Sequence, residues 1–217
     1  MNESVHIYGP RVSNFVRSVQ LCCEEKGVAY TLGDVVGGEK REYQGSWHLA
    51  LNPFAKVPVL LHGERHLCET ASICRYLDAA FDGPALQPED PWQRAQVDQW
   101  SAVLTLYVDQ AIMRRYLKEL LFPQGEDGSI RMDRVQEAEP EVARMLTLLE
   151  AQLGEREFLV GERFTIADAL AVPMLDYLSK LPRAAPLVAD APLLSAYVQR
   201  LRERPSGSQV LLDLNVA

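Results

Sequence analysis

The side chains most suggestive of chemistry in the N-terminal part of the sequence are those that could bind an anion. Ser13 follows the turn residues Gly9 and Pro10 and directly precedes residues 14–26, whose apolar residues recur with helical spacing. A residue at a helix N-terminus lies beside free backbone N–H groups and the positive end of the helix dipole. Its hydroxyl can cap the helix or donate a hydrogen bond to an anion in front of it, and the sequence leaves both roles open.

A second stretch, residues 52–60, could bind the backbone of an extended ligand. Pro58 has no N–H to contribute to a sheet, so it must stand at an edge or at the first position of a strand. In a cis Val57–Pro58 bond, a form that about one X–Pro bond in twenty adopts, the N–H and C=O of Val57 would face outward. They could then pair with a peptide-like molecule.

A third stretch places an acid and a hydroxyl at the start of another predicted helix. Glu69 and Thr70 stand at the beginning of residues 70–81, which have helical spacing. The free N–H groups of the first turn, together with Thr70, could hold a carboxylate, and Glu69 could hold an amine. This pair could therefore bind an amino-acid head group, although a plain helix cap has the same appearance.

The strands and helices predicted to position these residues follow one another along the chain as strand–helix–strand (βαβ) and then strand–strand–helix (ββα). Gly27 is well placed to end the helix predicted over residues 14–26. Residues 33–52 are rich in glycine and charged groups and are predicted to form a loop with at most one short helix. Four β-rich runs complete the pattern, at residues 5–8, 29–36, 57–61 and 65–68.

A segment rich in proline marks the clearest boundary, at residues 83–91. Its three prolines and one glycine cannot continue a helix. Thr165 and Asp168 fit a capping box further along the chain. We predict an α/β domain at 1–82, a linker at 83–91 and an all-α domain at 92–217. In the all-α domain, apolar residues recur with helical spacing over residues 92–121, 134–153, 166–178 and 192–204.

Composition argues against several classes of protein. The 217 residues carry a net charge of −8, whereas nucleic-acid-binding domains are typically basic. The sequence shows no signal peptide and no apolar run long enough to span a bilayer, so we expect a cytoplasmic protein that binds neither nucleic acid nor membrane. No C-x-x-C pair occurs, and we expect no metal and four reduced thiols, Cys22, Cys23, Cys68 and Cys74.

In order and spacing, these features resemble the cytosolic glutathione transferase superfamily. The resemblance is to its serine-type families, which are phi, tau and many bacterial relatives, and it runs from about residue 5 to about residue 205. Thr70 takes the place of the usual serine and keeps the hydroxyl. Four segments carry the resemblance: Ser13 to Tyr30, Asn52 to Leu60 with the pattern N-P-x-x-x-V-P-x-L, Cys68 to Leu77, and Phe164 to Asp168.

The resemblance implies a thioredoxin-like glutathione-binding domain followed by a helical bundle, and a homodimer. Glutathione would be the co-substrate. By position, Ser13 matches the thiol-activating serine of the family. Val57 and a cis Pro58 would pair with the cysteinyl backbone of glutathione.

The same resemblance assigns the two ends of glutathione. Glu69 and Thr70 would hold its γ-glutamyl head. Lys40 and Lys56 would face the glycyl carboxylate, with Arg41 as the alternative to Lys40. The activity would be conjugation of the glutathione thiolate to a small apolar electrophile.

The electrophile is expected to bind in a pocket between the two domains. An apolar stripe at helical spacing can equally belong to a core, so these residues are candidates only. The candidate wall residues are Pro10, Tyr107, Met113, Tyr116 and Leu117.

Other functions remain open. A non-catalytic binding or regulatory protein of the same fold would keep the glutathione-binding residues without turnover. A thiol transferase would need a cysteine where this chain has Ser13, and Cys22 and Cys23 lie two or more turns inside the helix. A zeta-type isomerase would need an S-S-C-S-like turn, which the sequence lacks.

Overall fold

A computed structural model describes residues 4–211, which form two compact units. The first contains residues 4–87 together with 204–211, and the second contains residues 88–203. The predicted domain boundaries at 1–82, 83–91 and 92–217 stay predictions. Residues 1–3 and 212–217, which they include, lie outside the described residues.

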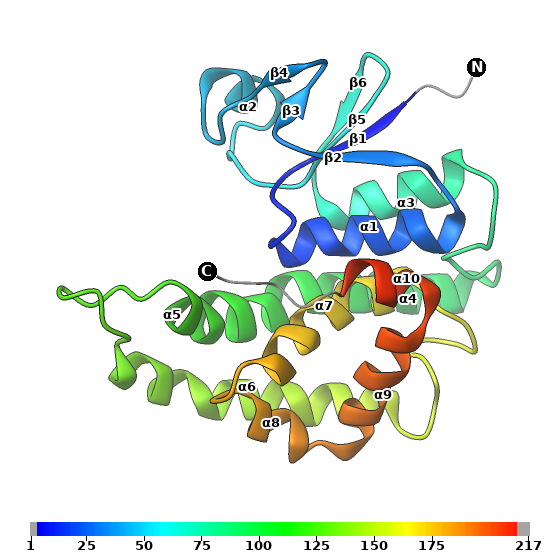
Figure 1. Ribbon diagram of the computed structural model, residues 1–217. Helices are drawn as coiled ribbons and strands as arrows, with labels where there is room; N and C mark the ends of the chain where they lie inside the picture. Colours follow the sequence, from blue (N-terminus) through cyan, green and yellow to red (C-terminus); the bar gives the residue numbers. More distant parts are fainter. Residues whose placement is uncertain (1–3, 212–217) are drawn as a thin grey trace. The chain divides into compact units, whose positions relative to one another are not determined.

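A mixed sheet forms the centre of the first unit (Figure 1). Its strands are β1 (Val5–Tyr8), β2 (Tyr30–Gly33), β5 (Val59–His62) and β6 (Arg65–Leu67). β1 is parallel to β2 and antiparallel to β5, β6 is antiparallel to β5, and the order is β2-β1-β5-β6. β5 begins two residues later than predicted, directly after Pro58, which has no N–H to give a neighbour. This topology confirms the predicted thioredoxin-like arrangement.

Two helices run side by side on one face of this sheet (Figure 1). α1 (Asn14–Lys26) and α3 (Thr70–Ala80) begin where they were predicted to begin. α1 ends at Gly27, whose left-handed backbone (φ 68°) lets its N–H reach carbonyls of the last turn. The core between helices and sheet contains Ile7, Val16, Val19, Leu60, Ile73 and Leu77, all buried.

The segment predicted as a loop holds more regular structure than expected. β3 (Val35–Val36) and β4 (Glu39–Lys40) form a short antiparallel hairpin, and α2 (Ser46–Leu51) follows it. The strand predicted over residues 29–36 is therefore two strands. It is interrupted after Gly33, whose positive φ of 127° redirects the chain.

The last described residues belong to the first unit. α10 (Pro205–Val210), a helix that the sequence analysis did not predict, packs on α1. Glu25 of α1 accepts two hydrogen bonds from the Arg204 guanidinium, at 2.9 and 2.7 Å, and one from the Ser206 hydroxyl. Arg11, in the loop after β1, donates to a carbonyl at the end of α10 at 3.0 Å. The loop before α1 is therefore tied to a segment almost 200 residues away in sequence.

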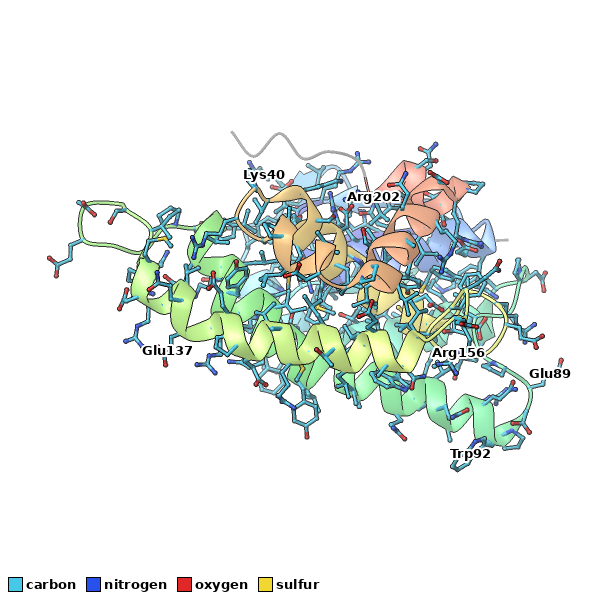
Figure 2. All side chains as sticks on the ribbon, turned by 90° about the horizontal axis from the view of Figure 1, so that it is seen from below. Lys40, Glu89, Trp92, Glu137, Arg156 and Arg202 are labelled. Carbon is cyan, nitrogen blue, oxygen red and sulfur yellow. The ribbon has the colours of Figure 1, made fainter. Side chains whose placement is uncertain are left out.

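The second unit is helical, as predicted. Its first long segment starts with α4 (Pro91–Val103), from which the 73% exposed side chain of Trp92 projects (Figure 2). The segment continues through the wider π-helical turns η1 (Leu104–Val108) and η2 (Gln110–Leu117) and ends with α5 (Lys118–Leu121). The apolar periodicity of the sequence did not predict these wider turns.

A second group of helices completes this unit. They are α6 (Met132–Leu153), α7 (Ile166–Lys180), α8 (Ala185–Ala189) and α9 (Pro192–Glu203). α7 is buried along almost its whole length, so it forms the centre of the unit. No helix within residues 4–211 combines the length and the apolar composition needed to cross a membrane.

The predicted capping box at the start of α7 is present. The buried carboxylate of Asp168 accepts from the N–H of Thr165 at 2.8 Å and from its hydroxyl at 2.9 Å. It also accepts from the N–H of Leu159 and the hydroxyl of Tyr197, each at 2.9 Å. With its lone pairs occupied in this way, Asp168 anchors the helix start and a neighbouring loop.

Candidate functional site

Ser13 caps α1, and its hydroxyl keeps a proton that it can donate. Its backbone is extended (φ −72°, ψ 127°), and its Oγ accepts from the N–H of Val16 at 3.4 Å. A hydroxyl that accepts a hydrogen bond still has its own O–H donor. The cap and the anion-binding role, which the sequence left as alternatives, are therefore compatible in one geometry.

Gly9 allows the first turn of α1 to approach Val57. A Cβ atom on Gly9 would lie 2.5 Å from Cγ2 of Val16 and 3.2 Å from Cβ of Val57. Both distances are shorter than the roughly 3.5–4.0 Å of good carbon–carbon contact. The end of β1, the Ser13-capped turn and the residue before Pro58 therefore belong to one closely packed site.

Val57 offers a backbone donor at this place. The Val57–Pro58 bond is cis, as the family resemblance implied. Within residues 4–211, no backbone or side-chain acceptor is found for the N–H of Val57. Val57 is half-buried and Pro58 is buried, so the donor lies on a fixed part of the chain.

The carbonyl of the preceding residue, Lys56, is held by two buried side chains. Asn52 Nδ2 donates to it at 3.0 Å, and His48 Nε2 lies 3.1 Å from it. The second polar atom of each of these side chains also forms a hydrogen bond. Asn52 Oδ1 accepts from the N–H of Phe54, and His48 Nδ1 accepts from the N–H of Gln44, each at 3.1 Å. The sequence analysis missed His48, which lies on α2, whereas Asn52 is the extended residue that directly follows this helix.

The start of α3 has an unusual backbone. Glu69 has φ 67° and ψ 112°, a region that residues other than glycine rarely occupy. No side chain caps α3, so the first-turn N–H groups remain available to a ligand. Glu69 is exposed and Thr70 is buried, and Cys68 Sγ lies 3.5 Å from the carbonyl of Leu51 at the end of α2. Burial and the charge of Glu69 raise the pKa of the Cys68 thiol.

The candidate cations differ in how firmly they are held. Lys56 is exposed, and Lys40 is exposed with a long 3.8 Å contact to an aspartate carboxylate. Arg41 is half-buried, with its guanidinium 2.6 Å from Glu39 and 5.2 Å from the ring centre of Trp47. The two lysines are therefore freer than Arg41 to reach a ligand carboxylate.

Tyr8 packs against residues of the candidate site, but its hydroxyl is bonded elsewhere and does not point to a ligand. Its buried ring lies about 5 Å from three others, with centroid distances of 5.1 Å to Tyr43, 5.1 Å to Trp47 and 5.0 Å to His48. Its hydroxyl donates to the carbonyl of Arg41 at 3.4 Å. Burial raises the pKa of Tyr8, and nearby carboxylates raise it further. Tyr8 is therefore a structural side chain of the site.

The predicted pocket residues are distributed over both units. Pro10 is a half-buried residue of the first unit. In the second unit Tyr107 is exposed and Met113 half-buried, whereas Tyr116 and Leu117 are buried. The pocket itself stays a prediction.

The cysteines of α1 do not suit nucleophilic chemistry. Cys22, Cys23 and Cys74 are free and buried. A hydrogen bond with Cys74, and then burial, raise the pKa of Cys22, and burial raises that of Cys23. Such thiols remain protonated, and the thiolate is the reactive form. Within the described residues no group of three or more His, Cys, Asp or Glu side chains could hold a metal ion.

Known proteins match both halves of the chain. The family model described as "Glutathione S-transferase, N-terminal domain" matches residues 7–85, and the model "Glutathione S-transferase, C-terminal domain" matches residues 110–205. The chain is 30% identical over 209 residues to glutathione S-transferase F10 of Arabidopsis thaliana, with 94% of each chain covered. The protein belongs to the glutathione S-transferase family.

Solved structures of this family share the fold. The theta class glutathione S-transferase of Xanthomonas axonopodis pv. citri, solved with glutathione bound, has a TM-score of 0.82 at 30% identity, covering 98% of this chain and 99% of that one. Glutathione transferase F7 of Populus trichocarpa has a TM-score of 0.83 at 25% identity, covering 95% and 97%. A thioredoxin-like domain followed by a helical glutathione S-transferase domain is thereby confirmed.

The close packing at Gly9 predicts that Gly9→Ala destabilises the protein and weakens glutathione binding. The added methyl must displace Val16 or Val57, and overpacking of this kind costs roughly 1–3 kcal/mol. Urea unfolding and calorimetry with glutathione measure the two effects. Gly33→Ala is the control. Gly33 also has a positive φ (127°, against 156° at Gly9), but a Cβ atom on Gly33 would meet no atom within 4 Å. Equal losses in both variants would contradict the packing argument.

Proposed function

We propose that this protein conjugates the thiol of glutathione to a small apolar electrophile. The observation that carries the proposal is the start of α1, where the Ser13 hydroxyl can donate at a helix N-terminus packed against Val57. The relatives matched along nearly the whole chain are named glutathione S-transferases. A related structure that contains bound glutathione supports the choice of co-substrate.

Ser13 would act by stabilising the thiolate. A free thiol has a pKa of about 8.5, and lowering it by two units requires about 2.7 kcal/mol of preferential stabilisation of the anion. A hydrogen bond to a charged acceptor supplies roughly 1.5–3 kcal/mol. The N-terminus of α1 adds roughly 0.3–1 kcal/mol. The combined range of these two contributions includes the required stabilisation, so the proposal invokes neither a metal nor a separate base.

The backbone and the γ-glutamyl end of glutathione would be held by neutral donors and one acid. The N–H of Val57, beside cis Pro58, would pair with the cysteinyl backbone. Thr70 and the uncapped first turn of α3 would bind the γ-glutamyl carboxylate. The exposed carboxylate of Glu69 would bind the adjacent amine.

Lys40 and Lys56 would face the glycyl carboxylate. Both ammonium groups extend into solvent, so they can approach a ligand with little rearrangement. Arg41 remains the alternative to Lys40, with the cost of leaving Glu39 and Trp47.

In the reaction, the thiol proton passes to solvent and the thiolate forms a carbon–sulfur bond with the electrophile. The electron pair displaced from that carbon departs with a leaving group. At an activated double bond it moves instead onto the neighbouring atom, which then takes up a proton from solvent. For the apolar wall that the second substrate would contact, the accessible candidates are Pro10, Tyr107 and Met113. The side chains of Tyr116 and Leu117 are fully buried, so they would only pack behind such a wall.

We further propose that the protein is a cytoplasmic homodimer. Large apolar side chains are exposed in each unit, among them Phe54 and Trp92, each 73% exposed. The proposal rests on the family resemblance, and these side chains are candidates for the surface that a partner subunit would cover. Light scattering at micromolar concentration should give twice the mass of one chain, and a single-chain mass would refute the dimer.

Ser13→Ala should reduce turnover about ten- to a hundredfold while most glutathione affinity remains. The lost hydrogen bond is worth more to the thiolate than to the thiol, so its removal acts on ionisation and only weakly on binding. The pH–rate profile should move to higher pH, because the pKa of the bound thiol returns toward its solution value. Conjugation assays and thiolate absorbance of bound glutathione against pH measure both effects.

Ser208→Ala is a matched control, because Ser208 is an exposed serine of α10 that bonds to a local carbonyl. It should leave both curves unchanged. If Ser13→Ala also leaves them unchanged, Ser13 is only a helix cap. A wild-type protein that binds glutathione but conjugates no electrophile would favour the non-catalytic alternative.

Glu69→Gln should weaken glutathione binding about tenfold. The amide keeps the shape of the side chain but loses the charge that would hold the ligand amine, an interaction worth roughly 1.5–3 kcal/mol when charge-assisted and less where water competes. Calorimetry at pH 7 measures the dissociation constant. Glu64→Gln, in the turn between β5 and β6, removes one exposed charge from the same unit without touching the site. If the two variants bind equally, Glu69 does not contact glutathione.

A further inference from the structure

We infer that His48 is a positioning residue for glutathione: as a neutral ring protonated on Nε2, it fixes the peptide that carries the Val57 N–H. The inference rests on the proposed function, since Val57 is the residue expected to pair with the cysteinyl backbone. His48 is 1% exposed, lies on α2, and is not itself placed to touch a ligand.

The hydrogen bonds of His48 define its tautomer. Nδ1 accepts from the N–H of Gln44 at 3.1 Å, and a nitrogen that accepts cannot also carry a proton. A neutral ring then carries its proton on Nε2, which lies 3.1 Å from the carbonyl of Lys56. A carbonyl can only accept, so Nε2–H donates there. Both contacts are satisfied by this single form of the ring.

The Lys56 carbonyl controls the direction of the Val57 N–H. The two groups belong to the same planar peptide unit, in which a trans bond makes C=O and N–H point in opposite directions. Among the described residues the one cis bond is Val57–Pro58, so the Lys56–Val57 bond is trans. With its carbonyl turned toward α2, this peptide must direct its N–H away from α2.

Two donors fix this peptide where one would leave it free to rotate. Asn52 Nδ2 and His48 Nε2 approach the same oxygen, at 3.0 and 3.1 Å, and together occupy its two lone pairs. The imidazole is itself held, because its ring packs 5.0 Å from that of Tyr8 and its Nδ1 is anchored. The proline-containing segment is therefore attached to α2 and its C-cap through two side chains, His48 and Asn52.

Two substitutions separate the two hydrogen bonds. His48→Gln places an amide donor near the position of Nε2 and so can keep the bond to Lys56. His48→Asn places an acceptor near the position of Nδ1 and so can keep the bond to Gln44. The shorter side chain cannot reach the carbonyl of Lys56, so that bond is lost. We expect the glutathione KM and dissociation constant to rise about three- to tenfold in the Asn variant and to stay near wild type in the Gln variant.

The turnover number discriminates positioning from a general loss of fold. Because Ser13 is untouched, kcat and the pH–rate profile should change little in either variant that folds. His66→Asn is the matched control, an exposed histidine on β6 that lies outside the site, and it should behave as wild type. A lowered melting temperature in His48→Asn with an unchanged glutathione dissociation constant would show a merely structural role and overturn the inference.

A measurement on the unaltered protein guards against variants that do not fold. Nitrogen NMR of protein labelled at its histidines reports which ring nitrogen is protonated, and His48 is assigned by comparison with the His48→Gln spectrum or, if that variant is unfolded, through contacts to the Tyr8 ring. We expect the Nε2–H form and a shift of its resonances when glutathione is added. A doubly protonated ring, an Nδ1–H form, or resonances unmoved by saturating glutathione would overturn the inference.

Binding of glutathione to the wild type separates this inference from the proposed function. If the wild type binds glutathione and His48→Asn binds it equally well, the inference fails and the proposed function stands. If the wild type does not bind glutathione, the proposed function fails and the inference fails with it.

Discussion

The site depends on one place where the chain has no room for a methyl group. At Gly9 the end of β1, the first turn of α1 and Val57 approach so closely that any Cβ would overlap Val16. The favourable field of a helix N-terminus extends over little more than one turn. A serine there is useful only if the ligand backbone is bound within the same short range. Contact across Gly9 supplies that proximity between residues more than 40 positions apart in sequence.

Neutral and charged side chains have separate places around the site. Three buried residues around the site, His48, Asn52 and Thr70, are not carboxylates, lysines or arginines. His48 and Asn52 are each held by two hydrogen bonds within the unit. The charged candidates Lys40, Lys56 and Glu69 are exposed. Burying an unpaired charge costs far more than burying a hydrogen-bonded neutral group. Charges meant for a zwitterionic ligand can therefore stay in water until the ligand supplies their partners.

Local patterns in the sequence predicted the features whose causes are local. The start of α1 at Asn14, its end at Gly27 and the Thr165–Asp168 capping box each follow from a few neighbouring residues, and all three are present. The order of strands and helices followed from alternating and helical periodicity. The family resemblance, in addition, implied the cis bond at Pro58.

Features with distant causes could not be predicted in this way. The role of His48 depends on a carbonyl eight residues later, and its imidazole gives no indication of that partner. α10 is stabilised through Glu25, about 180 positions away, and its own six residues are too few to form a stable helix in isolation. The break of the predicted strand after Gly33 and the π-helical turns η1 and η2 depend on backbone conformation that apolar spacing does not encode.

The return of the chain to its first unit sets an order of events during synthesis. α1 is complete once residue 26 has been made, but the segment that packs on it, Arg204 to Val210, is made only after the whole helical unit. Domains generally fold as units while translation proceeds from the N-terminus. Here the surface of α1 around Glu25 stays open to solvent and to other proteins while the whole helical unit is translated. A messenger truncated before codon 204 would encode every residue proposed to touch glutathione and still leave that surface uncovered.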